Sequence, residues 1–576
     1  MTPDRGELAR IRALSRRQAY PADLARRMSE HLARPHSSPP FDLYPEQAVT
    51  LLEASDCAGV VMPVPVGGGK TIVSFLVPEV CDLRRPLLII PAHLREKTLR
   101  EWQEYNQYWR LRPLVVKSYT EISRDKDAEG ISRLLETLAP DGIICDEAHH
   151  LGNLDAGCTK KIRRYLLANP HVKFFALTGT LLKATLMDGW HLCAHALKDR
   201  SPLPLRKQVC AQWSEAVDPQ FDDVTRARKA AAAGLDELGH GDPRRVIGEW
   251  IAGTPGYVSA STRYDGPLSF ASTTIEPPDA CREHIGNAHA GKRPDGLPID
   301  PFARLGIKYP GTAEEGQRIA FQKWRLAQTL FLGYWDKPHP EPPEAWVLSK
   351  AHWFGYVAGA LATSPELDTP EAVVYAVDRG KLGGKSARAK LAAWRKARDS
   401  YRYRAVATWV DTAAPALVYA AEWMNEHPHG LVWCASESAG HQICRLAGRD
   451  PAEYFFGAGQ GESDGAGRVR KPVEAHDGPA VLTIAANRSG RNLQHGWRDN
   501  LMLISPSLSG EWEQMIGRTH RPGQKHSVSV EIVVGLQAHQ SAWESAWKNA
   551  LFVEGMTGDS PKILQATGLA PDDGQP

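Results

Sequence analysis

The feature that most constrains this fold is a strand–loop–helix unit around residue 64. An apolar run at residues 60–62 predicts a buried strand, and residues 72–76 predict the first turns of a helix. Between them lies a glycine-rich loop at residues 64–71, with the sequence VPVGGGKT. Glycines let backbone N–H groups approach a phosphate closely, and the following helix directs its N-terminal N–H groups and the positive end of its dipole toward it. This order of elements predicts a phosphate-binding loop.

The loop contains the side chains that a nucleoside triphosphate with magnesium requires. Lys70 can reach the β- and γ-phosphates, and the hydroxyl of Thr71 can bind Mg²⁺. The glycines expected to cradle the phosphates are Gly67, Gly68 and Gly69. The usual spacing of this motif begins with a glycine, where this chain has valine at position 64. A flexible glycine turn is the alternative interpretation of the loop taken alone.

Two adjacent carboxylates follow a later strand. Residues 142–145 form an apolar run, and Asp146 and Glu147 come directly after it. Asp146 can reach a magnesium ion held by Thr71, and Glu147 can polarise a water molecule for in-line attack on the γ-phosphate. The alternative is a solvated loop, which explains paired carboxylates at a strand end poorly. We interpret His149 and residues 178–180 either as contacts that relay the nucleotide state or as polar loop residues.

The first 190 residues predict a parallel β-sheet. Apolar runs at 85–94, 113–122, 142–151 and 173–182 alternate with helical stretches, the pattern of a doubly wound α/β domain. Ligands of such sheets collect at the carboxyl ends of the strands, where each of these runs has its polar residues. Ahead of them, Pro45 marks a helix start, and Gln47 follows in the first turn. Its amide can both donate and accept, as an adenine edge requires, although an ordinary first-turn residue is an equal alternative.

Composition excludes several classes of protein. The 576 residues are 42% hydrophobic and 24% charged, as in ordinary globular proteins, and the length predicts roughly three to five domains. The formal net charge is +2, so any nucleic-acid binding must use a local basic stripe. No apolar run approaches the ~18 residues of a membrane span. No signal-peptide pattern opens the chain.

Cysteine usage indicates a reducing compartment. The nine cysteines are dispersed and form no C-x-x-C pair, so we expect free thiols, no zinc site and a cytoplasmic protein. Frequent alanine and arginine hint at a bacterial or phage source. We expect a monomer.

Residues 183–403 have a different character, with helical patches joined by segments rich in proline and glycine. A hairpin is expected at 257–275, turning at Asp265 and Gly266. Most tryptophans here are expected to pack in cores, with base stacking open for one or two. The sequence GKLGGKS is not interpreted as a second phosphate loop, because Pro370 starts a helix where a strand is required.

The most distinctive part of this region is a basic, aromatic stretch at residues 379–404. We interpret it as a contact for a nucleic-acid backbone, against the alternative of a solvated helical face. The residues expected to make that contact are Lys385, Arg388, Arg395, Lys396 and Arg398.

A second sheet domain follows. Strands are expected within 430–435, 479–485 and 500–506, and the segment 513–525 reads EQMIGRTHRPGQK. Arg518 and Arg521 are spaced to share one helical face ahead of a Pro-Gly stop. Two guanidinium groups on one face suit a planar grip on a triphosphate.

Taken together, these segments resemble the motifs of superfamily 2 helicases and translocases, and within them the Swi/Snf-type branch with a DEAH box. The matching segments occur in the family order and cover residues 41–182 and about 404–535; they read DLYPEQ, VGGGKT, PAHL, DEAH, LTGT, NRSGRNL and QMIGRTHRPGQ. The chain departs from the family at Val64, at Asn487 and Arg488, which replace glycines, and in lacking a proline after LTGT.

The resemblance implies ATP hydrolysis between two RecA-like lobes, driving movement along nucleic acid, usually duplex DNA. By position, Gln47 would read adenine, Thr71 and Asp146 would hold Mg²⁺, and Glu147 would activate water. The second lobe would supply Gln514, Arg518 and Arg521, the last as the arginine finger. Gly490, Asn492 and Leu493 would lie in the loop that couples ATP to the nucleic acid, with Asn492 a nucleic-acid contact.

The predicted architecture is therefore α/β, with two RecA-like doubly wound parallel-sheet lobes separated by a large, mainly helical insertion. The expected segments are a leader helix at 1–40, lobe 1 at 41–190, the insertion with a hairpin at 191–403, lobe 2 at 404–545 and a weakly ordered tail at 546–576. A DNA-stimulated ATPase is the favoured function. An RNA helicase and a nucleotide-gated nucleic-acid-binding scaffold remain the alternatives.

Overall fold

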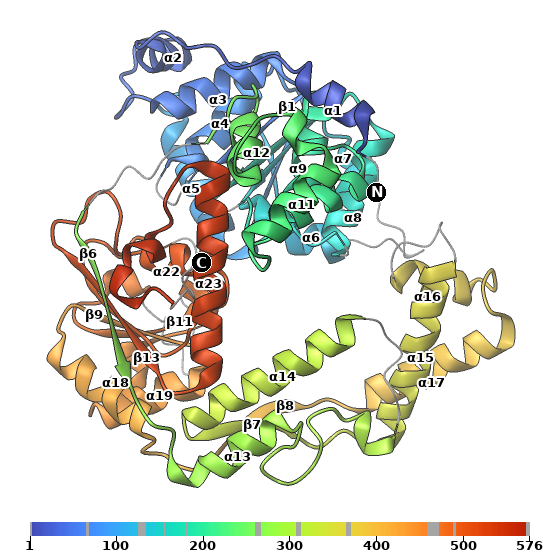
Figure 1. The fold of residues 1–576 in the computed structure, drawn as a ribbon, viewed down its shortest axis with the longest axis vertical. Coiled ribbons are helices and arrows are strands. Elements are labelled where there is room, and N and C mark those ends of the chain that lie inside the picture. The colour runs from blue at the N-terminus through green and yellow to red at the C-terminus, as the bar shows by residue number, and fades with distance from the viewer. Residues whose placement is uncertain are drawn as a thin grey trace.

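The computed structural model describes residues 3–64, 68–124, 134–154, 156–179, 181–259, 266–306, 313–363, 370–457, 472–487 and 491–571. Three bodies make up the molecule, and we call them lobe 1, lobe 2 and the arm (Figure 1). Each lobe contains one parallel β-sheet, whereas the arm is mainly helical and leads away from lobe 2. The α/β class and the parallel sheets predicted from sequence are confirmed.

The sheet of lobe 1 has five parallel strands in the order β1-β5-β4-β2-β3. Their bounds are β1 (Gly59–Pro63), β2 (Pro86–Ile90), β3 (Val115–Ser118), β4 (Gly142–Asp146) and β5 (Lys173–Thr178). Alternate residues enter two separate hydrophobic cores, for example Ile143 on one face and Ile144 on the other. Burial on both faces explains why these strands read as continuous apolar runs. Because β5 lies between β1 and β4, the phosphate loop and the carboxylate pair flank one strand.

Helices cover both faces of this sheet. They are α3 (Pro45–Asp56), α4 (Lys70–Val80), α5 (Arg95–Tyr105), α6 (Tyr119–Arg124), α7 (Leu134–Leu138) and α8 (Gly157–Ala168). The leader forms two short helices, α1 (Arg5–Arg12) and α2 (Leu24–Leu32), where a single helix was expected.

Lobe 1 also extends beyond its predicted end at residue 190. Four more helices pack into its core, namely α9 (Trp190–Leu197), α10 (Lys207–Ala216), α11 (Asp223–Ala233) and α12 (Pro243–Ala252). Their buried side chains, such as Trp213 and Ile247, join the same hydrophobic cluster as Phe174 of β5. The structure therefore assigns residues up to about 259 to lobe 1 rather than to the insertion.

The sheet of lobe 2 has six parallel strands in the order β10-β11-β9-β12-β13-β6. Their bounds are β6 (Leu268–Thr274), β9 (Gly430–Cys434), β10 (Phe455–Phe456), β11 (Ala480–Thr483), β12 (Asp499–Met502) and β13 (Val528–Val534). The expected hairpin at 257–275 does not account for β6, which pairs in parallel with β13 instead of with a neighbouring antiparallel strand. The expected turn residue Asp265 lies outside the described residues.

The helices of lobe 2 lie on the two faces of its sheet. They are α18 (Pro415–Glu426), α19 (Glu437–Leu446), α20 (Pro451–Tyr454), α21 (Ile484–Asn487) and α22 (Ser509–Ile516). Leu417 of α18 and Trp512 of α22 enter different cores, one on each face. Buried Asn487, where the family has glycine, donates to the carbonyl oxygen of Phe456 over 2.7 Å and so ties α21 to the edge strand. Arg488 lies outside the described residues.

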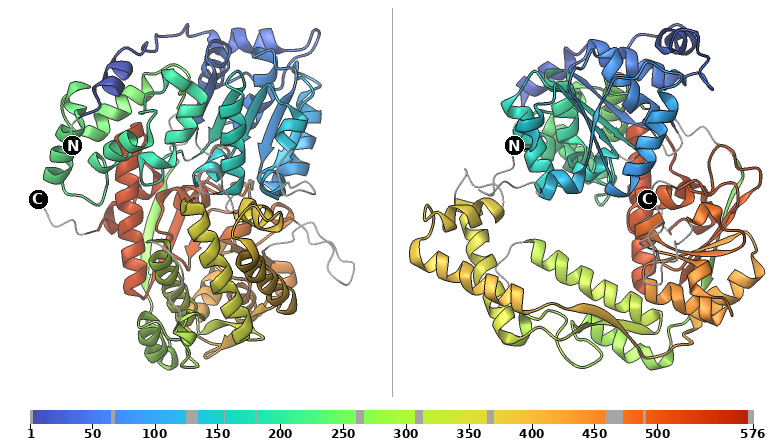
Figure 2. Two further views of the ribbon diagram at one scale, coloured as in Figure 1. Left: turned by 90° about the vertical axis from the view of Figure 1, so that its right-hand side faces the viewer. Right: turned by 180° about the vertical axis from the view of Figure 1, so that it is seen from behind.

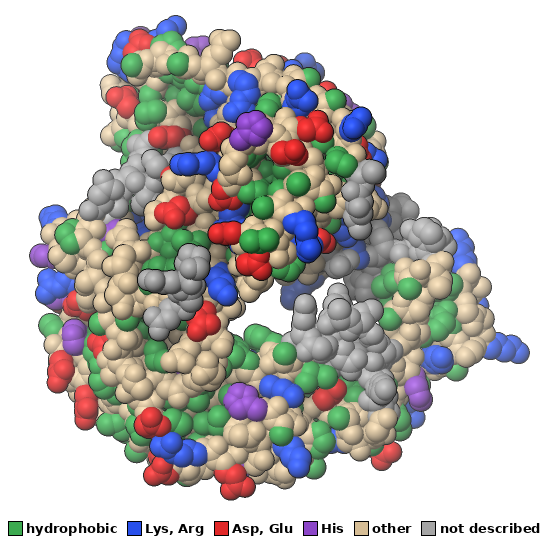
Figure 3. Space-filling view, viewed as in Figure 1, with side chains coloured by type: hydrophobic (Ala, Val, Ile, Leu, Met, Phe, Trp, Pro, Cys, Tyr) green, Lys and Arg blue, Asp and Glu red, His purple; other side chains and the backbone are tan. Residues whose placement is uncertain are grey.

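The arm is the predicted insertion, reduced to about residues 279–409. It consists of α13 (Asp279–His289), α14 (Ala313–Phe331), β7 (Tyr334–His339), α15 (Glu344–Thr363), α16 (Pro370–Asp378), α17 (Gly384–Ser400) and β8 (Arg404–Trp409). β7 and β8 form an antiparallel pair. A helix starts at Pro370 as predicted, so helices flank GKLGGKS on both sides and no second phosphate loop forms. The arm curves around an opening that lobes 1 and 2 also border (Figures 1 and 3).

One helix belongs to both lobes. α23 (Gln537–Thr557) runs alongside both lobes (Figures 1 and 2). It buries Trp547 in a core of lobe 2 and Phe552 in the core of lobe 1. A Cβ on Gly248 of α12 would lie 2.4 Å from the carbonyl oxygen of Met556, so only glycine permits this close packing. The predicted boundary at residue 545 therefore falls inside a helix, and the segment after it is packed, with Ile563 fully buried.

Two further expectations concern the whole chain. All nine cysteines are unpaired, and all except Cys81 are buried. Within the described residues, no helix combines the length and the apolar character needed to cross a membrane.

Candidate active site

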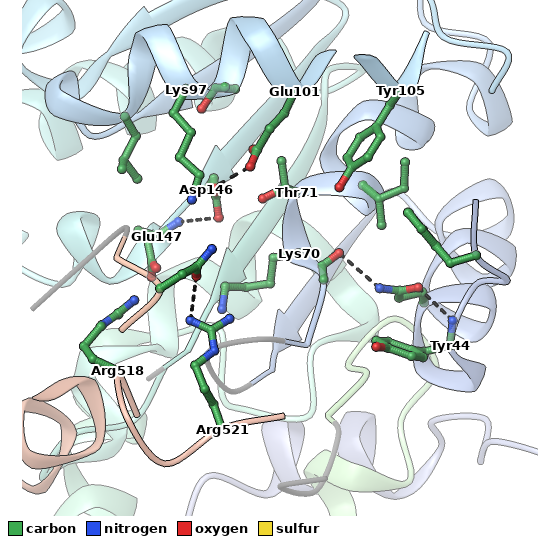
Figure 4. A pocket seen from close by; sticks show the side chains of 17 residues that line it. Tyr44, Lys70, Thr71, Lys97, Glu101, Tyr105, Asp146, Glu147, Arg518 and Arg521 are labelled. Atoms are coloured by element: carbon green, nitrogen blue, oxygen red, sulfur yellow. Dashed lines mark hydrogen bonds and ion pairs between the residues drawn. The ribbon is translucent and has the colours of Figure 1, made fainter. Parts of the chain in front are cut away.

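A cavity of about 340 Å³ lies between the two lobes, and most of the site residues predicted from sequence line it (Figure 4). Lobe 1 contributes the phosphate-loop residues and the carboxylate pair, and lobe 2 contributes two arginines and an asparagine. These predicted residues are Gln47, Gly69, Lys70, Thr71, Asp146, Glu147, Asn492, Arg518 and Arg521. Residues more than four hundred positions apart in the chain thus face one another across a single cavity.

The phosphate loop ends at Gly69, which has φ +72° and precedes the first turn of α4. A Cβ there would lie 2.0 Å from Nε2 of Gln47, so the backbone conformation favours glycine and a larger residue would displace the Gln47 amide. Gly67 lies outside the described residues. Lys70 is buried and donates from Nζ to the carbonyl oxygen of Val64 over 2.9 Å.

Val64 shows why this loop can start without glycine. Its side chain is 1% exposed and belongs to the core of lobe 1, and its N–H donates to the carbonyl oxygen of Thr178 over 2.8 Å. Position 64 therefore continues the path of β1 beside β5. A valine is favoured by burial at this position.

The Gln47 side chain is hydrogen-bonded to the phosphate loop. Its Nε2 donates to the carbonyl oxygens of Gly68 and Gly69, each over 3.2 Å, and its Oε1 accepts the N–H of Tyr44 over 2.8 Å. The side chain is 2% exposed. The amide thus holds the loop in place, and a contact to adenine remains a prediction.

The carboxylate pair ends β4. Glu147 has φ +54° and ψ +48°, a left-handed conformation that is uncommon outside glycine and recurs at functional sites. Burial and the adjacent Glu147 raise the pKa of Asp146 to about 7. Burial opposes ionisation of Glu147 as well, but the Lys70 ammonium and the His149 ring outweigh it and hold the pKa of Glu147 below its usual range. The surroundings therefore favour the ionised form of Glu147 over that of Asp146.

His149 connects this carboxylate to the neighbouring strand. Its Nδ1 lies 3.3 Å from Oε2 of Glu147 and 3.2 Å from Oγ1 of Thr178, the buried last residue of β5. This contact joins the DEAH and LTGT segments. It favours the interpretation of His149 as a contact that relays the nucleotide state over that of an ordinary polar loop residue. Thr180 lies outside the described residues.

The two arginines follow α22 instead of sharing its face. The helix ends at Ile516, with Gly517 as its C-cap, so the expected i, i+3 helical arrangement does not form. Arg518 is 3% exposed; its Nε donates to the carbonyl oxygen of Gln514 over 3.0 Å, and its Nη1 donates to that of Arg491 over 3.1 Å. Burial and the neighbouring Arg521 lower the pKa of Arg518 to about 10.

Arg521 lies beside it, and burial lowers its pKa too. Nη1 of Arg521 donates to Oδ1 of Asn492 over 2.9 Å, and its Nε has no hydrogen-bond partner within the described residues. The hydrogen bonds found for both guanidinium groups go to amide oxygens, not to carboxylates. A buried and a half-buried cation whose hydrogen bonds avoid carboxylates form a site for an anion.

Several residues that line the cavity were not predicted as site residues from the sequence. Phe41, Tyr44 and Tyr105 supply aromatic surface at one end of the cavity, with the rings of Phe41 and Tyr105 5.8 Å apart edge to face. Lys97 and Glu101 line it farther along α5. The residues at 97, 101 and 105 recur every four positions, so they share one face of α5, and that spacing was the available signal.

Two predicted residues have other positions than expected. Gln514 lines a separate cavity of about 100 Å³ that also touches Glu147. Asn492, expected to contact nucleic acid, lies in the main cavity against Arg521. Gly490 lies outside the described residues, and Leu493 is fully buried.

Most of the basic stretch of the arm forms helix α17, far from the helices α4 and α5 that line this cavity (Figure 1). Lys385, Arg388, Lys396 and Arg398 are exposed along it. Arg395 instead pairs with Asp378, with two contacts of 2.9 and 2.7 Å. Arg398 likewise contacts Asp399 over 3.0 Å. Two of the predicted contacts are thus engaged in ion pairs, and Lys385, Arg388 and Lys396 remain as exposed cations.

No family model matches the sequence of this chain, and no curated protein matches it either. The likeness of its short motifs to superfamily 2 therefore stays a prediction, and the geometry of the cavity is the principal observation about function.

Proposed function

We propose that this chain is an ATP hydrolase with two RecA-like lobes that moves along or remodels nucleic acid, with duplex DNA as the favoured substrate. One observation carries the proposal: Arg518 and Arg521 of lobe 2 line the same cavity as Lys70 and Glu147 of lobe 1 (Figure 4). A phosphate loop alone would support nucleotide binding. Arginines from a second lobe add the groups that stabilise charge in phosphoryl transfer.

The distribution of side chains in the cavity fits a nucleoside triphosphate. The aromatic residues Phe41, Tyr44 and Tyr105 offer apolar surface for a base, while Lys70 and the arginines offer positive charge for phosphates. Lys70 would exchange the carbonyl oxygen of Val64 for a phosphate oxygen. This exchange favours the anion, because the ammonium group binds an oppositely charged phosphate oxygen more strongly than a neutral carbonyl oxygen.

The same cavity fits magnesium. The hydroxyl of Thr71 and the carboxylate of Asp146 both line it, and Mg²⁺ prefers one or two such protein oxygens together with water and phosphate oxygens. When bound, the ion would neutralise charge between the β- and γ-phosphates. A positive ion beside Asp146 also favours ionisation of that carboxyl group.

Glu147 is suited to accept a proton from the attacking water. Lys70 and His149 hold its pKa below the usual range, its left-handed backbone turns it out of the strand direction, and His149 contacts it from one side. Arg518 and Arg521 would meet charge that grows on the γ-phosphate during the reaction, which is the role of an arginine finger. Hydrolysis then requires both lobes.

Dependence on both lobes provides a means of coupling to nucleic acid. A strand or duplex that contacts both lobes would favour the arrangement in which the arginines reach the triphosphate, and so raise the hydrolysis rate by shifting the population. The exposed cations of α17 give the arm a surface for the backbone of such a partner.

The test is the ATPase rate of the full chain without nucleic acid and with duplex DNA, single-stranded DNA or RNA. We expect slow basal turnover and the strongest stimulation by duplex DNA. Glu147→Gln should keep ATP binding and lose turnover. Rates near zero under all four conditions, or normal turnover by Glu147→Gln, would overturn the proposal, and stimulation by RNA alone would support the RNA helicase instead.

A further inference from the structure

The arm contains a second cavity that ATP hydrolysis does not use. It measures about 360 Å³, close to the 340 Å³ of the cavity between the lobes. Its walls come from the segment 293–304, from α14, from β7 and the segment entering β8, and from the first turns of α15. Aromatic rings and cationic side chains make up much of the lining. A cavity of this size is typical of sites for small molecules or single nucleotides.

A fixed aromatic platform forms one side of this arm cavity. Tyr401 is 7% exposed and donates from its hydroxyl to the carbonyl oxygen of Pro340 over 2.8 Å. The ring of Tyr403 stacks on it, with centroids 5.6 Å apart and planes 15° apart, and Trp346 meets Tyr401 edge to face at 5.2 Å. Tyr403 is 59% exposed. Its outer face can therefore receive another flat ring.

Positive charge lies next to these rings. Arg325 is 61% exposed and contacts Asp336 through one nitrogen over 3.2 Å, which leaves much of its guanidinium group in solvent. The ammonium group of Lys350 lies 4.7 Å from the centroid of Trp346. Ring and cation are thus adjacent within one cavity, an arrangement suited to a ligand that is both flat and anionic.

A more deeply buried arginine keeps the cavity wall in shape. Arg293 is 7% exposed, donates to Asp295 and Glu341, and lies 5.3 Å from the centroid of Trp335. Two lining side chains have buried polar atoms without a hydrogen-bond partner within the described residues, namely Oε1 of Gln322 and Nε of Arg304. Buried polar atoms of this kind are uncommon, and a small rotation would offer an acceptor and a donor to the edge of a base.

We propose that the arm cavity binds an unpaired nucleotide of single-stranded nucleic acid, with the base stacked on Tyr403 and the phosphate beside Arg325. A base within a duplex cannot occupy it, because neighbouring base pairs cover both of its faces. A phosphate without a ring would make no use of the tyrosine stack. This inference rests on the proposed function only in that the partner is nucleic acid. It adds that the arm holds one strand where bases are unpaired.

The test is the equilibrium binding of a fluorescently labelled ten-residue oligothymidylate to the full chain without ATP. Tyr403→Ala should weaken binding at least fivefold, because stacking on an aromatic ring contributes strongly to each bound base. Tyr403→Trp should restore it. Arg325→Ala should weaken binding and flatten its salt dependence. A blunt duplex of the same length should be insensitive to Tyr403→Ala.

Two matched controls separate the cavity from the general surface. Phe321→Ala removes a 58% exposed ring of α14 that stacks on Trp324 outside the cavity. Arg402→Ala removes an exposed arginine next to Tyr403 that does not line the cavity. If wild type does not bind the oligonucleotide, or if Tyr403→Ala stays within twofold of Phe321→Ala, the proposal is wrong.

The outcome is independent of ATP hydrolysis. Binding is measured without ATP, so the arm cavity can bind the oligonucleotide even if no nucleic acid stimulates the ATPase. That combination of results would contradict only the proposed nucleic-acid-stimulated ATPase. If duplex DNA stimulates the ATPase but Tyr403→Ala binds the oligonucleotide as wild type does, only the arm proposal is wrong.

Discussion

Nη1 of Arg521 donates a hydrogen bond of 2.9 Å to Oδ1 of Asn492, and both side chains line the cavity opposite Lys70. The contact aims the guanidinium group without neutralising it, since an amide oxygen carries no net charge. The loop containing Asn492 thereby positions the arginine that we expect to act on the γ-phosphate.

Replacing that arginine should affect turnover far more than binding. In Arg521→Ala we expect kcat for ATP hydrolysis to fall about 10³-fold or more, as for other arginine fingers, with the affinity for ATP reduced less than tenfold. Nucleotide titration and steady-state ATPase assays measure the two effects. Arg445→Ala, at an exposed position of α19, should behave as wild type. An Arg521→Ala protein with normal kcat would exclude the finger role.

The phosphate loop offers a pair of glycines with nearly the same backbone angle. Gly69 has φ +72° and a Cβ there would meet Gln47 at 2.0 Å, whereas Gly448 has φ +70° and nothing within 4 Å. Gly69→Ala should therefore abolish measurable ATP binding, while Gly448→Ala should cost only about 1 kcal/mol of backbone strain. Calorimetric titration with ATP and denaturant unfolding compare the two variants. If the two variants lose ATP affinity and stability equally, the contact with Gln47 is not required for ATP binding.

The shared helix α23 predicts a mechanical link between the lobes. Phe552 is fully buried in the core of lobe 1 although its helix starts in lobe 2. Phe552→Ala should lower the free energy of unfolding by about 3–5 kcal/mol through the cavity it leaves and separate the unfolding of the lobes into two transitions. Leu446→Ala, at a 37% exposed position, is the control. A single unshifted transition for Phe552→Ala would contradict the link.

Lobe 1 should lose stability in mild acid because of two buried histidines on α9. Burial lowers the pKa of His191 and of His195 to about 4, against about 6.5 for the unfolded chain. Above pH 6.5 both are neutral in either state, so the stability is complete there. As the pH falls from 6.5 toward 4 the unfolded state binds more protons, and each pKa unit of separation costs up to about 1.4 kcal/mol.

Thermal unfolding between pH 4 and 7.5 measures this loss. His191→Phe should flatten the pH dependence, although it also removes the 2.8 Å hydrogen bond from Nε2 to the carbonyl oxygen of Leu151 and lowers the Tm at neutral pH. His352→Phe, at an exposed position of α15, should leave the slope unchanged. If Tm depends on pH equally in wild type and His191→Phe, this histidine does not cause the loss of stability in acid.

What the sequence by itself determined is local in character. Lys70 and Thr71 after three glycines, and Asp146 with Glu147 after an apolar run, were readable because each pattern spans a few residues of one strand–loop unit. The parallel sheets were readable for the same reason, since burial on both faces makes most residues of the central strands apolar.

Only the tertiary structure decided which surfaces meet. That Arg521 reaches the cavity of Lys70 depends on how the two lobes pack. That Asn492 holds this arginine, and that Tyr105 of α5 adds aromatic surface beside Lys70, depend on how each lobe folds. The assignment of α9 to α12 to lobe 1 and of β6 to the sheet of lobe 2 depends on packing as well. These contacts join residues far apart in the chain, and no local pattern encodes them, because burial selects apolar side chains without specifying their partner.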